Sequence, residues 1–269
     1  MIPQQRRTPT DTFPGEFRYR RDRVLNEETM FTENQELEWS EIPFEDASAK
    51  YELNGISEDG LGEVFPEDPP HYLVRQGDVV IDGPVNFGAA DEGDVTLHVI
   101  DGDLTVNGPL FFIQGDFYGA LLVTGSIFCQ QAFVDMDAML DVGKSMNVEG
   151  MPFTHLSKPA HFAVKEALVA GSWLEASGDG LFEIGQKPQA RLLRVEKSSY
   201  HAFSKYAEEA EKRAQEEGTE VKKPSYFGFS PKEASSVRGI LHPSLIKGEE
   251  GIDARAIREA MEEGRPLFA

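Results

Sequence analysis

The sequence predicts a mainly β protein built around a parallel β-solenoid, with an acidic N-terminal segment and a C-terminal α-helical cap. Short strand phrases punctuated by glycine recur through the middle of the chain, and no window of helix length separates them. Helix signals gather instead near the C-terminus. We expect three regions: an arginine-rich arm and acidic segment over residues 1–70, a solenoid over 71–195 and a helical region over 196–269.

The first region divides by charge. Residues 1–26 are polar and rich in arginine, without the apolar stretch of a secretory signal. Between Glu27 and Pro70 the chain has 14 acidic residues against one basic residue, Lys50. Large apolar residues interrupt this acidic run, and alternation from Glu36 to Ile42 indicates a half-buried strand. We expect the acidic segment to pack on the first solenoid turns, with the arginines of the arm pairing with its carboxylates.

From Leu73 to Ile184 one phrase keeps returning. Its copies read GDVVIDGPV, GDLTVNGPL, LLVTGSIFC and LDVGKSMNVEG, and a degenerate copy runs from Phe162 to Gly171. The glycines at positions 77, 102, 125 and 143 lie roughly 18 to 25 residues apart, a spacing typical of one solenoid rung. The sequence therefore predicts a stack of such rungs.

Each phrase has the alternation that a rung requires. Leu104 and Val106 are predicted to face inward, between the outward Asp103, Thr105 and Asn107. Glycine and asparagine suit the corners between strands, where φ can be positive. A single rung cannot bury its inner face, so only stacked rungs form a core. An antiparallel meander in a sandwich uses similar phrases and is the alternative fold.

The C-terminal region carries helix signals after a last short strand at 192–195. A helix is predicted from the N-cap Ser199 to Gly218, and another from the N-cap Asp253 through Glu263. Residues 252 and 257 occupy the hydrophobic-staple positions around the second cap. We expect these helices to cover an end or a flank of the solenoid.

The net charge of −21 narrows the possible partners. Such an acidic surface repels phosphate backbones and anionic lipids, so direct binding to nucleic acid or membrane is not expected. Basic proteins, cationic ligands and metal ions are the compatible classes. Cys129 is the single cysteine, which rules out an internal disulfide and fits a reducing compartment. No apolar run approaches the roughly 18 residues of a membrane span, so the expected location is the cytoplasm.

The histidines and the cysteine give no catalytic or metal motif. No histidine pair has the spacing of a helical zinc site, although His155 and His161 could meet within one rung. Cys129 lies in an alternating strand, where a buried small hydrophobe is the favoured interpretation. Gly143-Lys144-Ser145 ends like a phosphate-binding loop but lacks the upstream glycine.

Two acidic pairs resemble the calcium ligands of solenoid lyases. They are Asp135 with Asp137, and Asp101 with Asp103. Outward aspartates at turns are the favoured interpretation of both pairs. We therefore predict no catalytic residue, no cofactor and no metal.

The phrases from Gly102 to Gly108 and from Leu121 to Ile127 resemble those of a group of bacterial β-solenoid proteins with GDLTVxG rungs. Members are labelled bactofilin-like or polymer-forming, and tend to be encoded near polymorphic or type VI secretion toxins. The C-terminal stretches LHPSLI and AMEEGRPL also resemble that group's ending, so the similarity covers roughly residues 73–269. The acidic segment has no counterpart in the group, and the rungs are less regular than in true bactofilins.

This resemblance implies an antitoxin-like immunity protein that binds a cognate toxin inside the producing cell. The acidic segment would occlude a basic active cleft of that toxin, with interleaved aromatics as anchors or as core residues. The predicted partner-binding residues are Glu33, Glu36, Glu38, Trp39, Glu41, Phe44, Glu45 and Asp46. We expect a monomer or dimer. A bactofilin-like scaffold and a solenoid enzyme acting on carbohydrate are the alternative functions.

Overall fold

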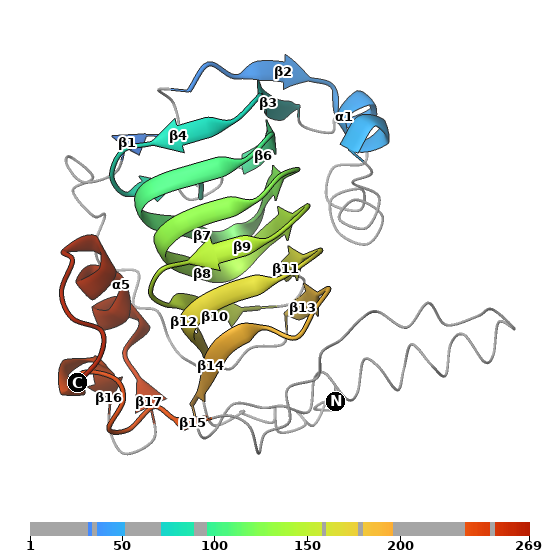
Figure 1. The fold of residues 1–269 in the computed structure, drawn as a ribbon. Coiled ribbons are helices and arrows are strands. Elements are labelled where there is room, and N and C mark those ends of the chain that lie inside the picture. The colour runs from blue at the N-terminus through green and yellow to red at the C-terminus, as the bar shows by residue number, and fades with distance from the viewer. Residues whose placement is uncertain are drawn as a thin grey trace, which may run out of the picture. The chain divides into compact units, whose positions relative to one another are not determined.

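A computed structural model describes residues 32–33, 37–51, 71–88, 96–157, 160–176, 180–195, 235–247 and 251–269. These residues belong to one compact unit, Phe31–Ala269. Its middle is a parallel β-solenoid of about five turns (Figure 1). Every pairing between successive rungs is parallel, with register partners such as Leu73, His98 and Leu121 roughly 23 to 25 residues apart. The predicted fold class is confirmed, and the antiparallel sandwich is wrong.

The registers arrange the strands on three faces. Four strands turn a corner without a break and so serve two or three faces: β7 (Leu104–Val123), β8 (Ile127–Val142), β12 (Leu168–Glu175) and β14 (Gln189–Arg194). The first face contains β3 (Tyr72–Gln76), β6 (Thr96–Asp101), residues 119–123 and 138–142, β11 (His161–Val164) and β13 (Leu181–Ile184).

The other two faces follow in the same order along each rung. The second face contains β4 (Val79–Ile81), residues 104–106 and 127–129, β9 (Met146–Val148), residues 168–170 and Gln189 of β14. The third face contains β5 (Val85–Asn86), residues 109–114 and 131–136, β10 (Pro152–Leu156), and residues 172–175 and 191–194. One interior core runs between them, and Leu104, Ile127 and Met146 are among its fully buried members.

The corner between the first and second faces explains the recurring glycines. A Cβ atom on Gly102 would lie 2.5 Å from the carbonyl carbon of Gly77, and one on Gly125 would lie 2.6 Å from the carbonyl oxygen of Gly102. Successive rungs therefore approach too closely at this corner for a side chain. The glycine spacing in the sequence is the period of this contact.

The N-terminal segment caps the first rung. β1 (Thr32–Glu33) pairs in parallel with β5, and β2 (Ser40–Ile42) pairs antiparallel with β3. The helix α1 (Phe44–Tyr51) then packs over the outer side of the first face, where Ala47 is fully buried in a cluster with Tyr72 and Val99. Tyr51 donates a hydrogen bond of 3.1 Å to Asp101, which anchors the end of the helix to the second rung.

The C-terminal segment joins the sheet through β15 (Ser235–Ser236), which pairs with β14. It continues through the 3-10 helix η3 (Pro243–Leu245) and the antiparallel pair β16 (Ile246–Lys247) and β17 (Gly251–Ile252) to α5 (Ala254–Glu262). Asp253 caps α5 by accepting a hydrogen bond of 3.1 Å from the backbone N–H of Ala256, and Gly264 follows with φ +63°. Both ends of this helix are as predicted, while the predicted helix at 199–218 lies outside the described residues.

The C-terminal segment covers the third face. An outward column of apolar residues crosses five rungs there: Phe111, Phe133, Phe153, Leu174 and Leu193. These residues form a second core with Val237, Leu241 and the buried side of α5, including Ile257 and Met261. The sequence predicted that the C-terminal helices cover an end or a flank of the solenoid but not which one. In the structure, the C-terminal segment covers the third face. The predicted staple residues Ile252 and Ile257 both lie in this core.

Candidate protein-binding surface

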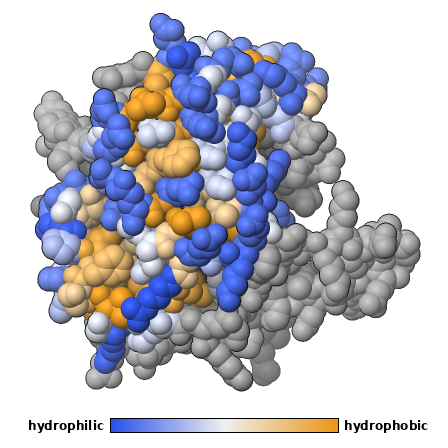
Figure 2. Space-filling model, in the orientation of Figure 1, coloured by the Kyte–Doolittle hydropathy of each residue, from blue (hydrophilic) through white to orange (hydrophobic). Residues whose placement is uncertain are grey.

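The outer side of the second face carries exposed apolar residues. Parallel registers align Val80, Thr105, Phe128, Asn147 and Val169 in one outward column across five rungs. Val80 is 66% exposed and Phe128 43% exposed. Of the large hydrophobic residues in the described part of the chain, only these two and Phe268 are exposed. We refer to this column as the open stripe. Figure 2 looks onto this face and shows hydrophobic side chains there among hydrophilic ones.

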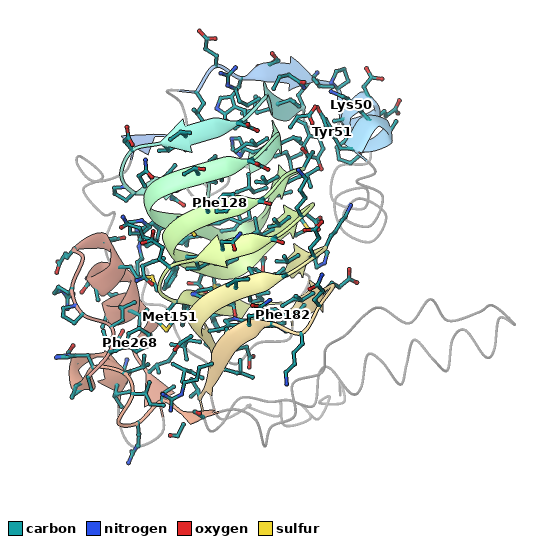
Figure 3. The ribbon with its side chains drawn as sticks, viewed as in Figure 1. Lys50, Tyr51, Phe128, Met151, Phe182 and Phe268 are labelled. Atoms are coloured by element: carbon teal, nitrogen blue, oxygen red, sulfur yellow. The ribbon has the colours of Figure 1, made fainter. Side chains whose placement is uncertain are left out.

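A shallow groove lies along the open stripe. It has a volume of about 310 Å³ and is lined mainly by outward side chains of four adjacent rungs: Thr105, Asn107, Phe128, Gln130, Asn147, Glu149 and Val169. Phe128, labelled in Figure 3, is one of the residues that line it. The groove combines an exposed aromatic ring with amide and carboxylate groups, which suits a protein partner better than a small ligand, because it is open and not enclosing.

Carboxylates stand on both sides of the open stripe. Asp78 and Asp103 lie at the corner that precedes the second face, and Asp82 lies at the corner that follows it. Each accepts a hydrogen bond from the next rung: Asp78 from the N–H of Asp103 at 2.9 Å, Asp103 from the N–H of Ser126 at 2.7 Å, and Asp82 from the side-chain amide of Asn107 at 2.7 Å. These bonds fix the positions of the charges. Lys144 lies on the same side, with its Nζ 4.0 Å from Asp103.

The other two faces are covered by the chain itself. α1 and Ile42 of β2 pack on the outer side of the first face, and the C-terminal segment packs on the third. In the described residues, no hydrophobic cluster places another segment of the chain over the outer side of the second face. Exposed apolar residues aligned between two faces that other segments cover are the kind of feature that marks an interaction site.

The predicted partner-binding residues lie in the N-terminal cap, between positions 33 and 46. In the sequence they precede the open stripe, which begins at Val80. Glu38, Glu41, Glu45 and Asp46 are exposed, whereas Glu36 lies outside the described residues and Glu33 is described by its backbone in β1. The two aromatics are half-buried and point into the protein. Trp39 packs on His98 with ring centroids 4.9 Å apart, and Phe44 packs on Tyr72 at 5.6 Å. They act as core residues of the cap, so neither of them is an exposed anchor beside these carboxylates.

The sequence analysis did not single out Val80 or Phe128. A signal for them was present, because aligning the phrases GDVVIDG, GDLTVNG and GSIFCQQ places Val80, Thr105 and Phe128 at the same outward position. Alternation predicts that this outward position faces solvent, where a polar residue is expected. An apolar residue there is therefore a sign that the position contacts something else. Burial of that column by another segment could not be excluded without the tertiary structure.

The Asp135–Asp137 pair lies at the corner between the third and first faces. Met136 between them has φ +63°, a backbone conformation that is rare for a residue with a side chain. Asp135 is buried, and its Oδ1 lies 2.8 Å from Nδ1 of His155 in the next rung, while Asp137 accepts a hydrogen bond from the hydroxyl of Ser157. In the described part of the chain, no group of three or more His, Cys, Asp or Glu side chains is placed to hold a metal ion.

His155 and His161 have separate carboxylate partners. Nε2 of His161 lies 3.8 Å from Glu183, in the rung beyond it. Burial lowers the pKa of each imidazole, but the neighbouring carboxylates outweigh it and raise the pKa above the ordinary value; these are Asp135 and Glu175 for His155, and Glu183 and Asp141 for His161. The described contacts therefore pair each histidine with acids of adjacent rungs and do not join them in one site.

Cys129 and Asp101 have structural roles. Cys129 is 4% exposed in the interior core, and burial together with the charge of Glu149 raises the pKa of its thiol, so the unreactive thiol form is favoured. Asp101 accepts hydrogen bonds from Tyr51, Lys50 and Thr124, which ties α1 to the solenoid. Neither residue is available as a nucleophile or a free cation ligand in this arrangement.

No family model, curated protein or solved structure matches the chain. No helix in the described residues is both long enough and apolar enough to span a membrane. The function is therefore inferred from the surface itself.

Proposed function

We propose that this chain is a non-enzymatic binding protein that neutralises a cognate bacterial toxin by covering a basic active cleft. The observation that supports it most is the open stripe, where Val80 and Phe128 are exposed and the carboxylates of Asp78, Asp82 and Asp103 lie along the edges of the same face. Exposed apolar anchors surrounded by polar residues are typical of protein interfaces.

The charge of the chain favours a basic partner. The net charge is −21, and exposed carboxylates occur both beside the open stripe and at the N-terminal cap. Complementary charge accelerates association and suppresses partners of like charge. Toxins that cleave nucleic acids need a basic cleft to attract phosphates, so they are a suitable class of target. The resemblance of the rungs to solenoid proteins encoded near toxins supports the same role.

Co-expression tests the proposal directly. A host cell would express the toxin encoded beside this gene, with and without the chain, and its growth would be followed. We expect the chain to restore growth and to form a complex whose affinity falls steeply as salt is raised. Unchanged killing in the presence of folded chain would exclude the proposed function.

A matched pair of variants links protection to the open stripe. Phe128→Ser removes an exposed aromatic from the second face, whereas Phe268→Ser removes one of similar exposure, 38%, from the C-terminal segment. We expect loss of protection with the first variant and full protection with the second. Equal protection by both would show that the open stripe is not the toxin-binding surface.

A scaffold subunit is less compatible with this structure. End-to-end stacking needs open, matching ends, but β2 pairs antiparallel with β3 over the first rung. Repulsion between copies of net charge −21 also opposes assembly. Sedimentation at high protein concentration should therefore give a discrete monomer or dimer, and filaments would favour the scaffold.

A further inference from the structure

We infer that the open stripe receives a single basic amphipathic α-helix of the partner, lying parallel to the solenoid axis. This inference rests on the proposed function, because it takes the partner to be a basic protein. Beyond the proposed function, it states that the bound element of the partner is a helix and that the helix axis lies along the solenoid axis.

The width of the second face fits one helix. Its outward positions run from the column of Asp78 and Asp103, through the open stripe, to the column of Asp82 and Asn107. The outer columns are four residues apart along each strand, which corresponds to about 13 Å. A helix with its side chains has a diameter of about 10–12 Å. A second helix would extend beyond the corners of the face.

The length and repeat of the stripe fit the same element. From Val80 to Val169 the column crosses five rungs. At about 4.8 Å per rung it extends about 19 Å, the length of about 13 helical residues. Apolar residues alternate with Thr105 and Asn147 along the column, so successive apolar positions are about 9.6 Å apart. Residues seven apart on a helix are separated by about 10.5 Å.

The charges match the two flanks of such a helix. A basic amphipathic helix presents an apolar stripe with lysine or arginine on both sides. The open stripe has Asp78 and Asp103 on one side and Asp82 on the other, each held by a hydrogen bond to the next rung. Glu149 extends the acidic margin to the groove around Phe128. Cations on both flanks would thus meet carboxylates while an apolar side chain contacts Phe128.

The fold uses the same kind of contact on its first face. There α1 packs over the outer side of the sheet, with Ala47 buried against Tyr72 and Val99. On the third face the column of phenylalanine and leucine residues shares one hydrophobic core with the buried side of α5. A second copy of this chain is a poor occupant of the open stripe, because the acidic margins of the two copies would face each other.

Two synthetic peptides of identical composition provide the probe. Both contain 15 residues of lysine, leucine and alanine, but in one the leucines form a single stripe and in the other they are dispersed around the helix. Binding of each labelled peptide to the full chain is measured by fluorescence anisotropy at about 0.1 M salt. We expect the striped peptide to bind at least tenfold more tightly than the dispersed one. Equal affinity for both would overturn the inference.

Variants then locate the binding. Phe128→Ser, or Val80→Ser as a second test of the same column, should abolish the difference between the peptides, whereas Phe268→Ser should preserve it. The double variant Asp82→Asn, Asp103→Asn keeps the side-chain oxygens that accept hydrogen bonds from the next rung but removes two negative charges. It should weaken the binding of both peptides by a similar factor. Loss of the difference in Phe268→Ser, or its survival in both stripe variants, would overturn the inference. Dimerisation that Phe128→Ser removes would do the same, by assigning the stripe to a second copy.

The two proposals can fail separately. If Phe128→Ser abolishes protection against the toxin while the peptides bind equally, the partner does not present a helix, and the proposed function stands. If the striped peptide binds as expected but the chain gives no protection, the helix site stands and the toxin proposal fails.

Discussion

The rings of Phe133 and Phe153 stack with their centroids 4.5 Å apart and their planes inclined by 18°. They belong to adjacent rungs and form the centre of the aromatic column on which the C-terminal segment packs. The contact therefore joins two rungs to each other and both rungs to a part of the chain that is distant in sequence.

Replacing Phe133 by alanine should destabilise the protein by about 3–5 kcal/mol, because a buried ring is lost from a core that cannot collapse onto it. Urea unfolding measures this change. The matched variant Phe268→Ala alters a ring that is 38% exposed and should change stability much less. Similar losses in both variants would contradict a core role for the column.

The glycine corner gives a second prediction. Gly102→Ala places a Cβ 2.5 Å from backbone of the preceding rung, whereas Gly77→Ala meets nothing within 4 Å and carries only the cost of φ +83°. We expect Gly77→Ala to destabilise by about 1–2 kcal/mol and Gly102→Ala to destabilise more, because backbone must move. The two midpoints of urea unfolding test this order. A larger loss in Gly77→Ala would show that φ, and not rung spacing, selects these glycines.

Because His98 is buried, we expect the folded protein to lose stability in mild acid. His98 is 3% exposed, between Trp39 and Phe87, and burial lowers its pKa to about 4. Above pH 6.5 the side chain is neutral in both states; below this value the unfolded chain gains a proton that the folded chain excludes. Stability should therefore fall between about pH 6.5 and 4, by about 3 kcal/mol in total. His98→Leu should flatten this part of the profile, and an unchanged slope would contradict the assignment.

His155 should change the stability of the folded protein with pH in the opposite direction from His98. Burial lowers the pKa of His155, but the hydrogen bond and charge of Asp135, with the charge of Glu175, raise it above the ordinary value. The folded state then holds a proton that the unfolded state releases, so this contribution is full below pH 6.5 and disappears as the pH rises through the folded pKa. Asp135→Asn should lower the pKa of His155 in an NMR titration. A pKa that stays raised in this variant would assign the shift to other groups.

Much of the fold could be predicted from local rules. The period of the glycines, the alternation around Leu104 and the N-cap Asp253 each express a constraint between near neighbours or equivalent positions of successive rungs. The predicted partner-binding residues were harder to interpret, because alternation in the acidic segment shows only that Trp39 and Phe44 differ from their neighbours in burial. Whether an aromatic faces a partner or the protein's own core depends on what packs against it.

By itself, the sequence determined that short strands stack in rungs, where the corners lie and which end carries the capped helix, because these features repeat or act within a few residues. Only the tertiary structure decided which face each outward column occupies and what covers it. Along β8, Phe128 and Phe133 each lie between two residues that face the interior core, so the sequence pattern around them is the same. Phe133 is nevertheless buried beneath the C-terminal segment, whereas Phe128 is exposed. The difference arises from contacts between segments about a hundred residues apart, which no local pattern encodes.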